Sequence, residues 1–369
     1  MTASLRPFGR TGAWVSPLTL GAMNFGARAN TDHAEGIRTI HRALDAGINI
    51  IDTADVYSHG ESEEIVGKAL AGGRREDVFL ASKVHGQIGG NVHHRGNSRR
   101  WIYQAVEHSL RRLGTDWIDL YQVHRPEEET DFEETLGALT DLVREGKIRY
   151  IGTSTFDASQ VVEGQWIAER RALQRVVAEQ PPYSILTRGI ERELLPVAQR
   201  YGLAVIPWSP LAGGWLANRH QRGVEQPRSG RADQFPARFD PAHPANAAKL
   251  EAAILLGELA DEIGISLIEL SVAWTLEHPA VTSVIIGPRD EAQLEDHLRV
   301  PEITLTADVL DRIDEIVPPG VNLNPLDAGW IPTWIAKPGA RRGGVHAERT
   351  PTWPQAHSPA TRVPAASAA

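Results

Sequence analysis

One junction recurs along this chain: LDAG-INIID at 44–52, LRRLG-TDWIDL at 110–120, LVREG-KIRYIG at 142–152 and AQRYG-LAVIP at 198–207. In each copy, a stretch typical of a helix ends at a glycine and a short apolar run follows. Glycine readily adopts the left-handed conformation that ends many helices, because it has no Cβ to clash with the backbone. The runs have the length and β-branched content of buried strands. The junction therefore predicts helices that are each followed directly by a strand.

Along the whole chain, the same pattern predicts eight strands separated by helices. The strands are expected at 18–23, 48–54, 78–84, 118–124, 148–154, 176–181, 204–209 and 283–287. The helices are expected at 33–46, 62–70, 99–113, 132–145, 158–172, 190–201 and 290–298. Regular alternation indicates parallel βαβ units, and eight strands favour a closed (β/α)8 TIM barrel over an open doubly wound sheet. We expect one barrel domain spanning residues 1–336.

Three segments lie outside this repeat. Residues 5–17 carry GRTG in their middle and predict a β-hairpin before the first strand. Residues 212–247, after strand 7, are rich in Gly, Pro, Arg and Asp and predict a long loop of the kind that often binds ligands. Residues 337–369 are poor in apolar side chains, so we expect a disordered C-terminal tail.

The composition excludes several classes of protein. The net charge is −9, from 38 basic and 47 acidic residues that are scattered along the chain, which argues against a nucleic-acid partner. The absence of cysteine excludes disulfides and thiolate metal sites. No stretch approaches the ~20 apolar residues of a membrane span, and no signal-peptide pattern opens the sequence. We expect a cytoplasmic protein without a membrane partner, and a homo-oligomer remains possible.

Four chemically complementary residues occur at or just after consecutive predicted strands. Asp52 and Tyr57 follow the second strand, Lys83 ends the third and His124 ends the fourth. Catalytic groups of (β/α)8 barrels come from the C-terminal ends of the strands, so these side chains are expected to converge. A tyrosine, with a pKa of about 10, exchanges protons poorly at neutral pH unless a cation stabilises the phenolate. Lys83 supplies that cation, Asp52 its counter-ion, and His124 a hydrogen bond to a substrate oxygen.

Seven motifs resemble one family. They are IDTADVY (51–57), LASKVH (80–85), SLRRLGTDWIDLYQVH (109–124), GKIRYIGTST (146–155), EQPPYS (179–184), PWSPLAGG (207–214) and IIGPRDEAQLEDHL (285–298). Over residues 5–317 the chain resembles aldo-keto reductases, in the branch that includes potassium-channel β-subunits and bacterial reductases. The resemblance implies an NADPH-dependent oxidoreductase that reduces aldehydes or ketones. It also implies that Asp52, Tyr57, Lys83 and His124 are the catalytic tetrad, with Tyr57 as general acid.

The same resemblance implies where NADPH binds. Ser154 and Gln180 would bond the carboxamide, and Trp208 would stack on the nicotinamide. Small residues of a turn would approach the pyrophosphate, and Arg289, near a helix N-terminus, would bind the phosphate that distinguishes NADPH from NADH. The full set of expected positions is Gly21, Met23, Asp52, Ser154, Thr155, Gln180, Trp208, Ser209, Pro210, Leu211, Gly213, Arg219, Arg231, Gly287, Arg289, Gln293, Asp296 and His297. Thr155 and His297 replace asparagines that are usual in the family.

Two other functions were weighed. A metal-dependent barrel hydrolase would use His85, His93, His94 and His124 with Asp52, but His93 and His94 are adjacent in a Gly/Asn-rich loop that is ill suited to hold one ion together. We therefore expect no metal. An NADP-binding sensor or accessory subunit with little turnover is the second alternative. The chain lacks a G-x-G-x-x-G after a strand, a P-loop and a G-x-S-x-G elbow, so other nucleotide-binding and hydrolase classes have no support.

Overall fold

The computed structural model describes residues 5–217, 220–222, 224–226, 230–332 and 335. Eight parallel strands form one sheet in the order β10-β3-β4-β5-β6-β7-β8-β9. Their bounds are β3 (Leu18–Gly21), β4 (Ile50–Asp52), β5 (Phe79–Val84), β6 (Ile118–Val123), β7 (Ile148–Ser154), β8 (Val176–Gln180), β9 (Ala204–Val205) and β10 (Val284–Ile286). Each corresponds to a predicted strand, although all except β7 are shorter than expected, β4 and β9 most of all.

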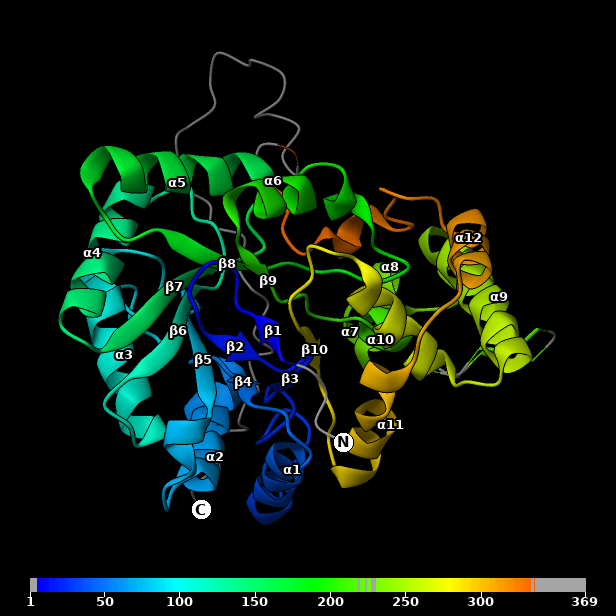
Figure 1. Ribbon diagram of the computed structural model, residues 1–369, viewed down its shortest axis with the longest axis horizontal. Coiled ribbons are helices and arrows are strands. Elements are labelled where there is room, and N and C mark those ends of the chain that lie inside the picture. Colours follow the sequence, from blue (N-terminus) through cyan, green and yellow to red (C-terminus); the bar gives the residue numbers. More distant parts are fainter. Residues whose placement is uncertain (1–4, 218–219, 223, 227–229, 333–334, 336–369) are drawn as a thin grey trace, which may run out of the picture. The chain divides into compact units, whose positions relative to one another are not determined.

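Hydrogen bonds between the first and last positions of this order close the sheet into a barrel. The amide of Thr282 donates to the carbonyl of Val205 at 2.8 Å, and the amide of Ile285 donates to Pro207 at 3.0 Å. These bonds join β9 to β10, so the sheet has no free edge. Figure 1 shows the helices arranged around the strands. The predicted (β/α)8 barrel is confirmed.

All seven predicted helices are present. They are α1 (His33–Asp45), α2 (Glu61–Leu70), α3 (Arg99–Leu113), α4 (Phe132–Arg144), α5 (Ala158–Arg171), α6 (Leu194–Tyr201) and α11 (Glu291–Leu298). At the four repeated junctions Gly47, Gly114, Gly146 and Gly202 have φ of 96°, 64°, 77° and 66°. These values lie in the left-handed region, as the junction predicted.

Three long helices were missed by the sequence analysis: α9 (Ala247–Ile263), α10 (Leu267–Glu277) and α12 (Ala307–Ile316). For α10 the reason is its burial, because seven consecutive residues from Leu270 to Leu276 are buried. A helix buried on all sides shows no apolar stripe with a 3.6-residue period. Its pattern therefore cannot be distinguished from an irregular apolar stretch.

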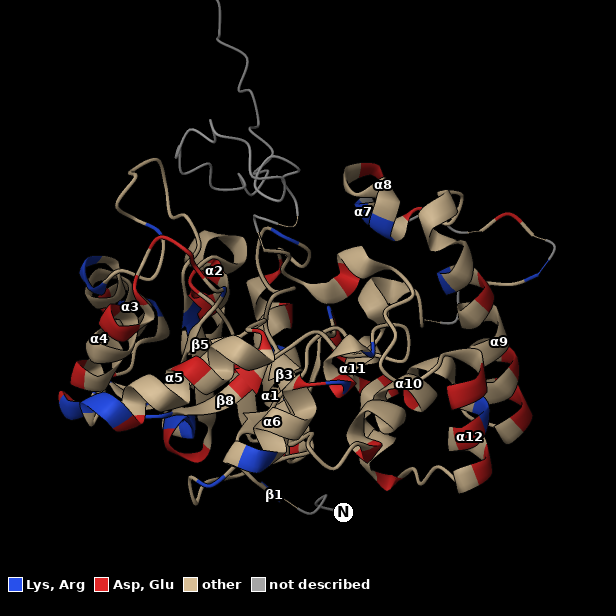
Figure 2. Ribbon diagram, turned by 90° about the horizontal axis from the view of Figure 1, so that it is seen from above, with Lys and Arg blue, Asp and Glu red and all other residues tan. Residues whose placement is uncertain are grey.

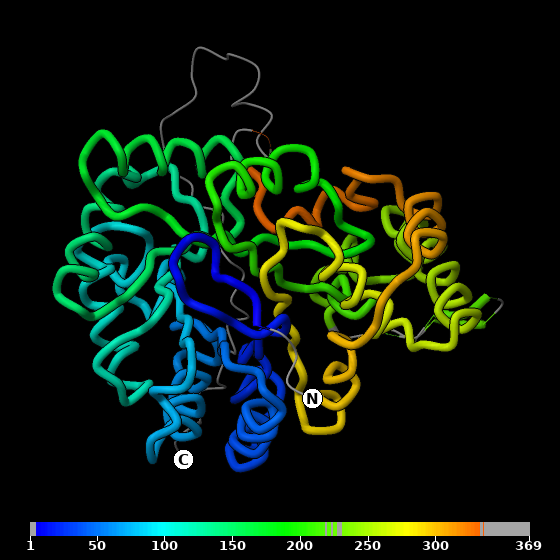
Figure 3. Tube along the Cα trace, in the orientation of Figure 1, coloured from blue at the N-terminus to red at the C-terminus, as the bar shows by residue number. Residues whose placement is uncertain are grey.

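The predicted N-terminal hairpin is confirmed, and it closes one end of the barrel. Strands β1 (Arg6–Pro7) and β2 (Trp14–Val15) pair antiparallel, and Figure 3 shows this hairpin, in dark blue, crossing in front of the strands. Phe8 and Val15 are fully buried. They pack with the interior residues of the barrel, which are Ile50, Ala81, Leu120, Ala178, Ala204 and Ile206. The hairpin thus provides the apolar floor of the barrel.

The predicted loop at 212–247 is only partly irregular, which corrects the expectation. It contains the short helices α7 (Gly230–Gln234) and α8 (Pro236–Phe239) before α9 begins. Pro236 occupies the first turn of α8, where its missing N–H has no helical partner to lose. The buried Asn246 amide donates to the carbonyls of Pro236 and Asp240, at 3.1 and 3.0 Å. Short-range turns of this kind have no long hydrophobic period, so the composition alone suggested a loop.

The segment after α12 is tied to this region. The carboxylate of Asp327 accepts hydrogen bonds from Arg238 at 2.9 Å and from the buried Lys249 at 2.6 Å. The amide of Asn324 donates to Ala237 at 2.7 Å and to Asn246 at 2.8 Å. Contacts divide the chain into two units, Met1–Trp330 and Ile331–Ala369, and the barrel lies in the first. The predicted tail at 337–369 lies outside the described residues.

The surface carries both signs of charge. Figure 2 shows basic and acidic residues interspersed over the outer helices. Among the described residues, no helix has the length and apolar character needed to cross a membrane.

The floor of the barrel provides a stability test. Phe8→Ala should lower the free energy of unfolding by about 3–5 kcal/mol, because it removes a fully buried ring and leaves a cavity. Trp14, on the same hairpin, is 57% exposed, so Trp14→Ala should change stability by no more than about 0.5 kcal/mol. Urea unfolding of both variants, followed by circular dichroism, measures the difference. Equal losses would contradict the role of the hairpin as a floor.

Candidate active site

The interior of the barrel changes from apolar to polar along the strands. Side chains two residues apart on a strand point to the same side. Ile50, Ala81 and Leu120 belong to the apolar interior beside the hairpin. Two residues further along β4, β5 and β6 lie Asp52, Lys83 and Gln122, and all three are buried. The strand period therefore places polar groups at the C-terminal end of the barrel, where barrel enzymes have their active sites.

Lys83 connects three parts of the site. Its Nζ donates to Asp52 Oδ2 at 2.5 Å, to the carbonyl of Thr53 at 2.9 Å and to the hydroxyl of Tyr57 at 3.1 Å. Burial by itself lowers the pKa of Lys83, but the charges of Asp52 and Tyr57 outweigh burial, and the net pKa is raised. Lys83 is therefore a permanent cation beside the phenol.

His124 completes the predicted tetrad. Its ring meets the Tyr57 ring edge to face, with 5.8 Å between the ring centroids. Burial lowers the pKa of His124 well below its usual value, and the cations Arg125 and Lys83 lower it further. The imidazole is consequently neutral at physiological pH, with one nitrogen that donates and one that accepts.

The second oxygen of Asp52 belongs to an amide network. Oδ1 accepts hydrogen bonds from Gln122 at 3.1 Å and from Gln180 at 2.8 Å. Ser154 Oγ donates to the backbone carbonyl of Gln180 at 2.9 Å. The Asp52 carboxylate and two expected carboxamide-binding residues therefore form one hydrogen-bonded unit, in which each member restricts the orientation of the next.

A turn after β9 holds several of the expected cofactor residues. Trp208 is half-buried, and its indole Nε1 is buried without a hydrogen-bond partner among the described residues. Ser209 and Gly213 have φ of 62° and 70°, and the Gly213 amide donates to Ser209 Oγ at 2.9 Å. Pro210 and Leu211 lie within this turn. Tight left-handed turns of this kind present backbone N–H groups and form concave sites for anions.

A second strained residue faces Trp208. Thr155, directly after β7, has a φ of 64°, a conformation that is unfavourable for a β-branched residue. Gly329, from the segment after α12, packs so closely on both that an added Cβ would lie 2.8 Å from Thr155 Cγ2 and 3.1 Å from the Trp208 ring. The backbone at Gly329 thus packs against the residues that follow β7 and β9.

The third group of expected cofactor residues follows β10. Since Ile285 is hydrogen-bonded to Pro207, the chain after β10 runs beside the turn after β9. Here Arg289 is exposed, and its backbone is fixed by bonds to Gln293 at 3.2 Å and to Asn30 at 2.7 Å. Asp296 is exposed and His297 is buried on α11.

The five remaining positions differ in their surroundings. Gly21 ends β3 as the register partner of Asp52, and an added Cβ there would lie 2.7 Å from Ile285 Cγ2. Met23 is half-buried, and Gly287 is exposed beyond β10. Arg231, on α7, donates to the carbonyl of Gly213 at 3.4 Å, which brings it to the turn after β9. Arg219 lies outside the described residues.

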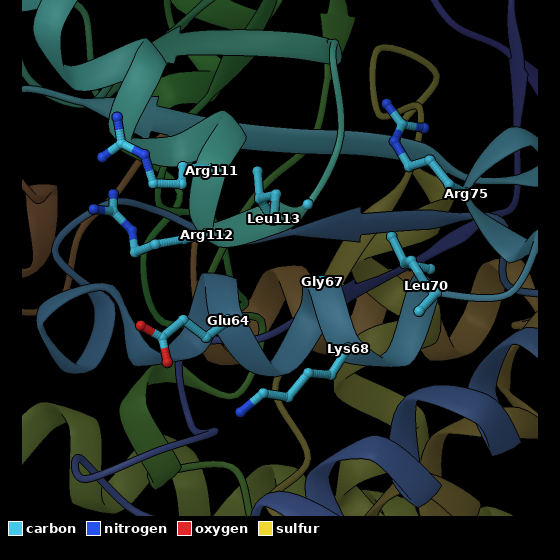
Figure 4. Close-up of a pocket in the computed structure, with 10 residues that line it drawn as sticks. Glu64, Gly67, Lys68, Leu70, Arg75, Arg111, Arg112 and Leu113 are labelled. Atoms are coloured by element: carbon cyan, nitrogen blue, oxygen red, sulfur yellow. The ribbon is translucent and has the colours of Figure 1, made fainter.

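A hollow lies elsewhere, on the outside of the barrel between α2 and the end of α3. It measures about 510 Å³, and Figure 4 shows Glu64 and Lys68 on α2 with Arg111 and Arg112 on α3 around it. Arg112 is paired with the buried Glu63. None of the predicted tetrad residues lines this hollow.

The metal-site alternative gains no geometric support. His85 Nδ1 lies 3.0 Å from Asn97 Oδ1, and the His94 ring stacks on Trp101 with 5.0 Å between centroids. Within the described parts of the chain, no group of three or more His, Cys, Asp and Glu residues is arranged to hold a metal ion.

The sequence analysis missed three residues of this site. Gln122 stands two residues before His124, so the strand period could have placed it in the interior. Arg125 follows His124 directly and reaches Ser154 and Thr155. Gly329 is far from the motifs in sequence, and no local signal predicts its approach to Trp208.

Comparison with known proteins agrees with this architecture. The sequence model of the aldo/keto reductase family matches residues 17–318, which include all eight strands and the four predicted catalytic residues. The chain belongs to the aldo/keto reductase family, and it is an oxidoreductase.

Three relatives cover nearly the whole barrel. The uncharacterized oxidoreductase YrpG of Bacillus subtilis (strain 168) is 40% identical over 321 residues, which cover 84% of this chain and 94% of that protein. A probable voltage-gated potassium channel subunit beta of Oryza sativa subsp. japonica is 35% identical over 320 residues, covering 84% and 95%. The versiconal hemiacetal acetate reductase of Aspergillus parasiticus is 33% identical over 332 residues, covering 83% and 95%.

The buried His297 should make stability depend on pH. Burial lowers its pKa from 6.5 to about 4. Between these values the unfolded chain binds a proton that the folded chain does not, so stability falls as the pH falls through this window. Between pH 7 and pH 5, the free energy of unfolding should therefore fall by about 1–2 kcal/mol less in His297→Asn than in the unaltered protein. Urea unfolding of both proteins at the two pH values, without cofactor, measures this difference. An equal fall in the free energy of unfolding in both proteins would show that His297 does not cause the pH dependence.

Proposed function

We propose that this protein reduces an aldehyde or ketone to an alcohol with NADPH as reductant, and that Tyr57 donates the proton. The contact of Lys83 Nζ with both Asp52 and the Tyr57 hydroxyl carries this proposal. In this arrangement a cation stands beside the phenol oxygen and can stabilise the phenolate that proton donation leaves behind.

The side chains divide the work between them. Lys83 lies 3.1 Å from the Tyr57 oxygen and stabilises the phenolate that remains after proton transfer. Asp52 keeps Lys83 charged in a buried site. His124 is neutral, so it can donate a hydrogen bond to the carbonyl oxygen and orient the substrate beside Tyr57. NADPH, when bound, supplies the hydride.

Several features fit a nicotinamide cofactor. The half-buried Trp208 would stack on the nicotinamide ring, and Ser154 and Gln180 lie at the ends of the paired strands β7 and β8. The left-handed turn from Ser209 to Gly213 suits a pyrophosphate. Arg289 is exposed just before α11 and would bind the additional phosphate of NADPH together with the helix N-terminus.

Tyr57→Phe should abolish most carbonyl reduction and leave NADPH binding nearly unchanged, because only the proton donor is removed. The rate of carbonyl reduction is measured as NADPH consumption, by absorbance, against a panel of aldehydes and ketones. Fluorescence titration measures NADPH binding. Loss of cofactor binding in this variant would show that Tyr57 is structural. Tight NADPH binding by the unaltered protein, without turnover on any substrate, would instead favour an NADP-binding sensor or accessory subunit.

Arg289→Met should weaken NADPH binding and leave NADH binding nearly unchanged, since the guanidinium is expected to contact only the phosphate that NADH lacks. The loss should amount to about 1.5–3 kcal/mol, as for a hydrogen bond to a charged group. Titration with both cofactors measures it. Arg312→Met, which removes an exposed arginine paired with Glu262 on the outer helices, is the control. Equal weakening of both cofactors would exclude this role for Arg289.

A further inference from the structure

Arg125 lies at the mouth of the barrel, beside the predicted tetrad. It follows His124 at the end of β6, and its Nη1 donates to the carbonyl of His124 at 2.6 Å and to Thr155 Oγ1 at 3.1 Å. Its guanidinium carbon is 5.8 Å from the centre of the Trp208 ring. The side chain therefore extends from the end of β6 past β7 toward the residues after β9, across the interior of the mouth.

Only part of this guanidinium is used. All three hydrogen bonds of Arg125 come from Nη1. Nε and Nη2 form no hydrogen bond among the described residues, and neither atom is fully buried. A guanidinium offers five N–H donors in a planar fork that matches a carboxylate. Two nitrogens are thus left to bind a ligand that enters the mouth.

Arg125 also lacks a counter-ion. Among the described residues, it forms no ion pair, although it is half-buried. The acidic residue Glu179 is engaged elsewhere, accepting hydrogen bonds from Thr153 at 2.5 Å and from the Phe156 amide at 3.1 Å. Burial raises the pKa of Glu179 to about 7, so it is only partly charged at neutral pH. The charge of Asp52 is neutralised by Lys83.

A partly buried cation without a counter-ion is unfavourable in the free protein. Burial and the positive charge of Arg238 lower the pKa of Arg125, and the opposing effects of Tyr57 and Glu179 do not offset them. An anion that entered the mouth would stabilise the charged guanidinium. The mouth is therefore complementary to a negatively charged ligand.

We propose that Arg125 binds a carboxylate on the substrate, so that the protein prefers aldehydes or ketones that carry a carboxylate near the carbonyl group. This inference rests on the proposed reductase function and names its substrate class. Arg125 is then a specificity-determining residue: it holds the charged end of the substrate while Tyr57 and His124 face the carbonyl oxygen.

The cofactor is a poorer explanation for this cation. The part of NADPH expected beside Ser154, Thr155 and Trp208 is the nicotinamide, which bears no negative charge. The phosphates have other expected partners, in the turn from Ser209 to Gly213 and at Arg289. No anionic part of the cofactor is therefore expected beside the Arg125 guanidinium.

The test compares each carboxybenzaldehyde isomer with its methyl ester. The three isomers vary the distance between carboxylate and carbonyl, and each ester removes the charge while keeping the shape. For at least one isomer, we expect kcat/KM to be about tenfold or more higher for the acid than for the ester, as one charge-assisted interaction provides. Arg125→Met should abolish this ratio, and Arg125→Lys should retain part of it. High salt should reduce it.

The acid-to-ester ratio separates a binding role from a structural one. If Arg125 only supported Ser154 and Thr155, the methionine variant would lose activity on acid and ester equally, and the ratio would not change. Arg312→Met, remote from the barrel mouth on α12, should leave the ratio as it is. An unchanged ratio in Arg125→Met, or no preferred acid in the unaltered protein, would overturn the inference. A protein that reduces no aldehyde or ketone would instead overturn the proposed function.

Discussion

The site depends on one buried ion pair, between Lys83 and Asp52. Neither charge would be tolerated alone in the barrel interior, because an isolated buried ion loses its hydration without compensation. Together they are compensated, and the amides of Gln122 and Gln180 satisfy the other oxygen of Asp52. The pair therefore fixes the ends of β4, β5, β6 and β8 relative to one another, at the place where Tyr57 meets Lys83.

The barrel makes this pair possible by separating two environments within one interior. At one end, the hairpin residues Phe8 and Val15 close an apolar layer against water. At the other end, the strands carry polar side chains that reach the loops. A closed barrel has no sheet edge, so its rigid strand ends can hold several polar groups in register. Charged groups are stable at one end because apolar groups supply the packing at the other.

Around this centre, the electrostatics of the mouth are one-sided. Lys83 is balanced by Asp52, whereas Arg125 has no counter-ion among the described residues. The strained conformations of Thr155 and Ser209 lie next to Arg125 and Trp208. Strain and unbalanced charge both cost stability, and both are concentrated where a cofactor and a substrate would bind. The packing of the rest of the fold supplies the stability that offsets this cost.

The sequence by itself determined the barrel, the hairpin and the positions of the four predicted tetrad residues at the strand ends, because glycine junctions and strand periods are local properties of the chain. It did not reveal α10, whose buried surface has no period, or the short helices between residues 212 and 247. Only the tertiary structure decided that Asp52 is shared by Lys83, Gln122 and Gln180, that Gly329 packs on Trp208, and that Arg125 lies unpaired among the described residues at the mouth. These contacts join segments that are far apart in the chain. The segments meet only because the closed barrel brings the strand ends together, which no local property of the sequence specifies.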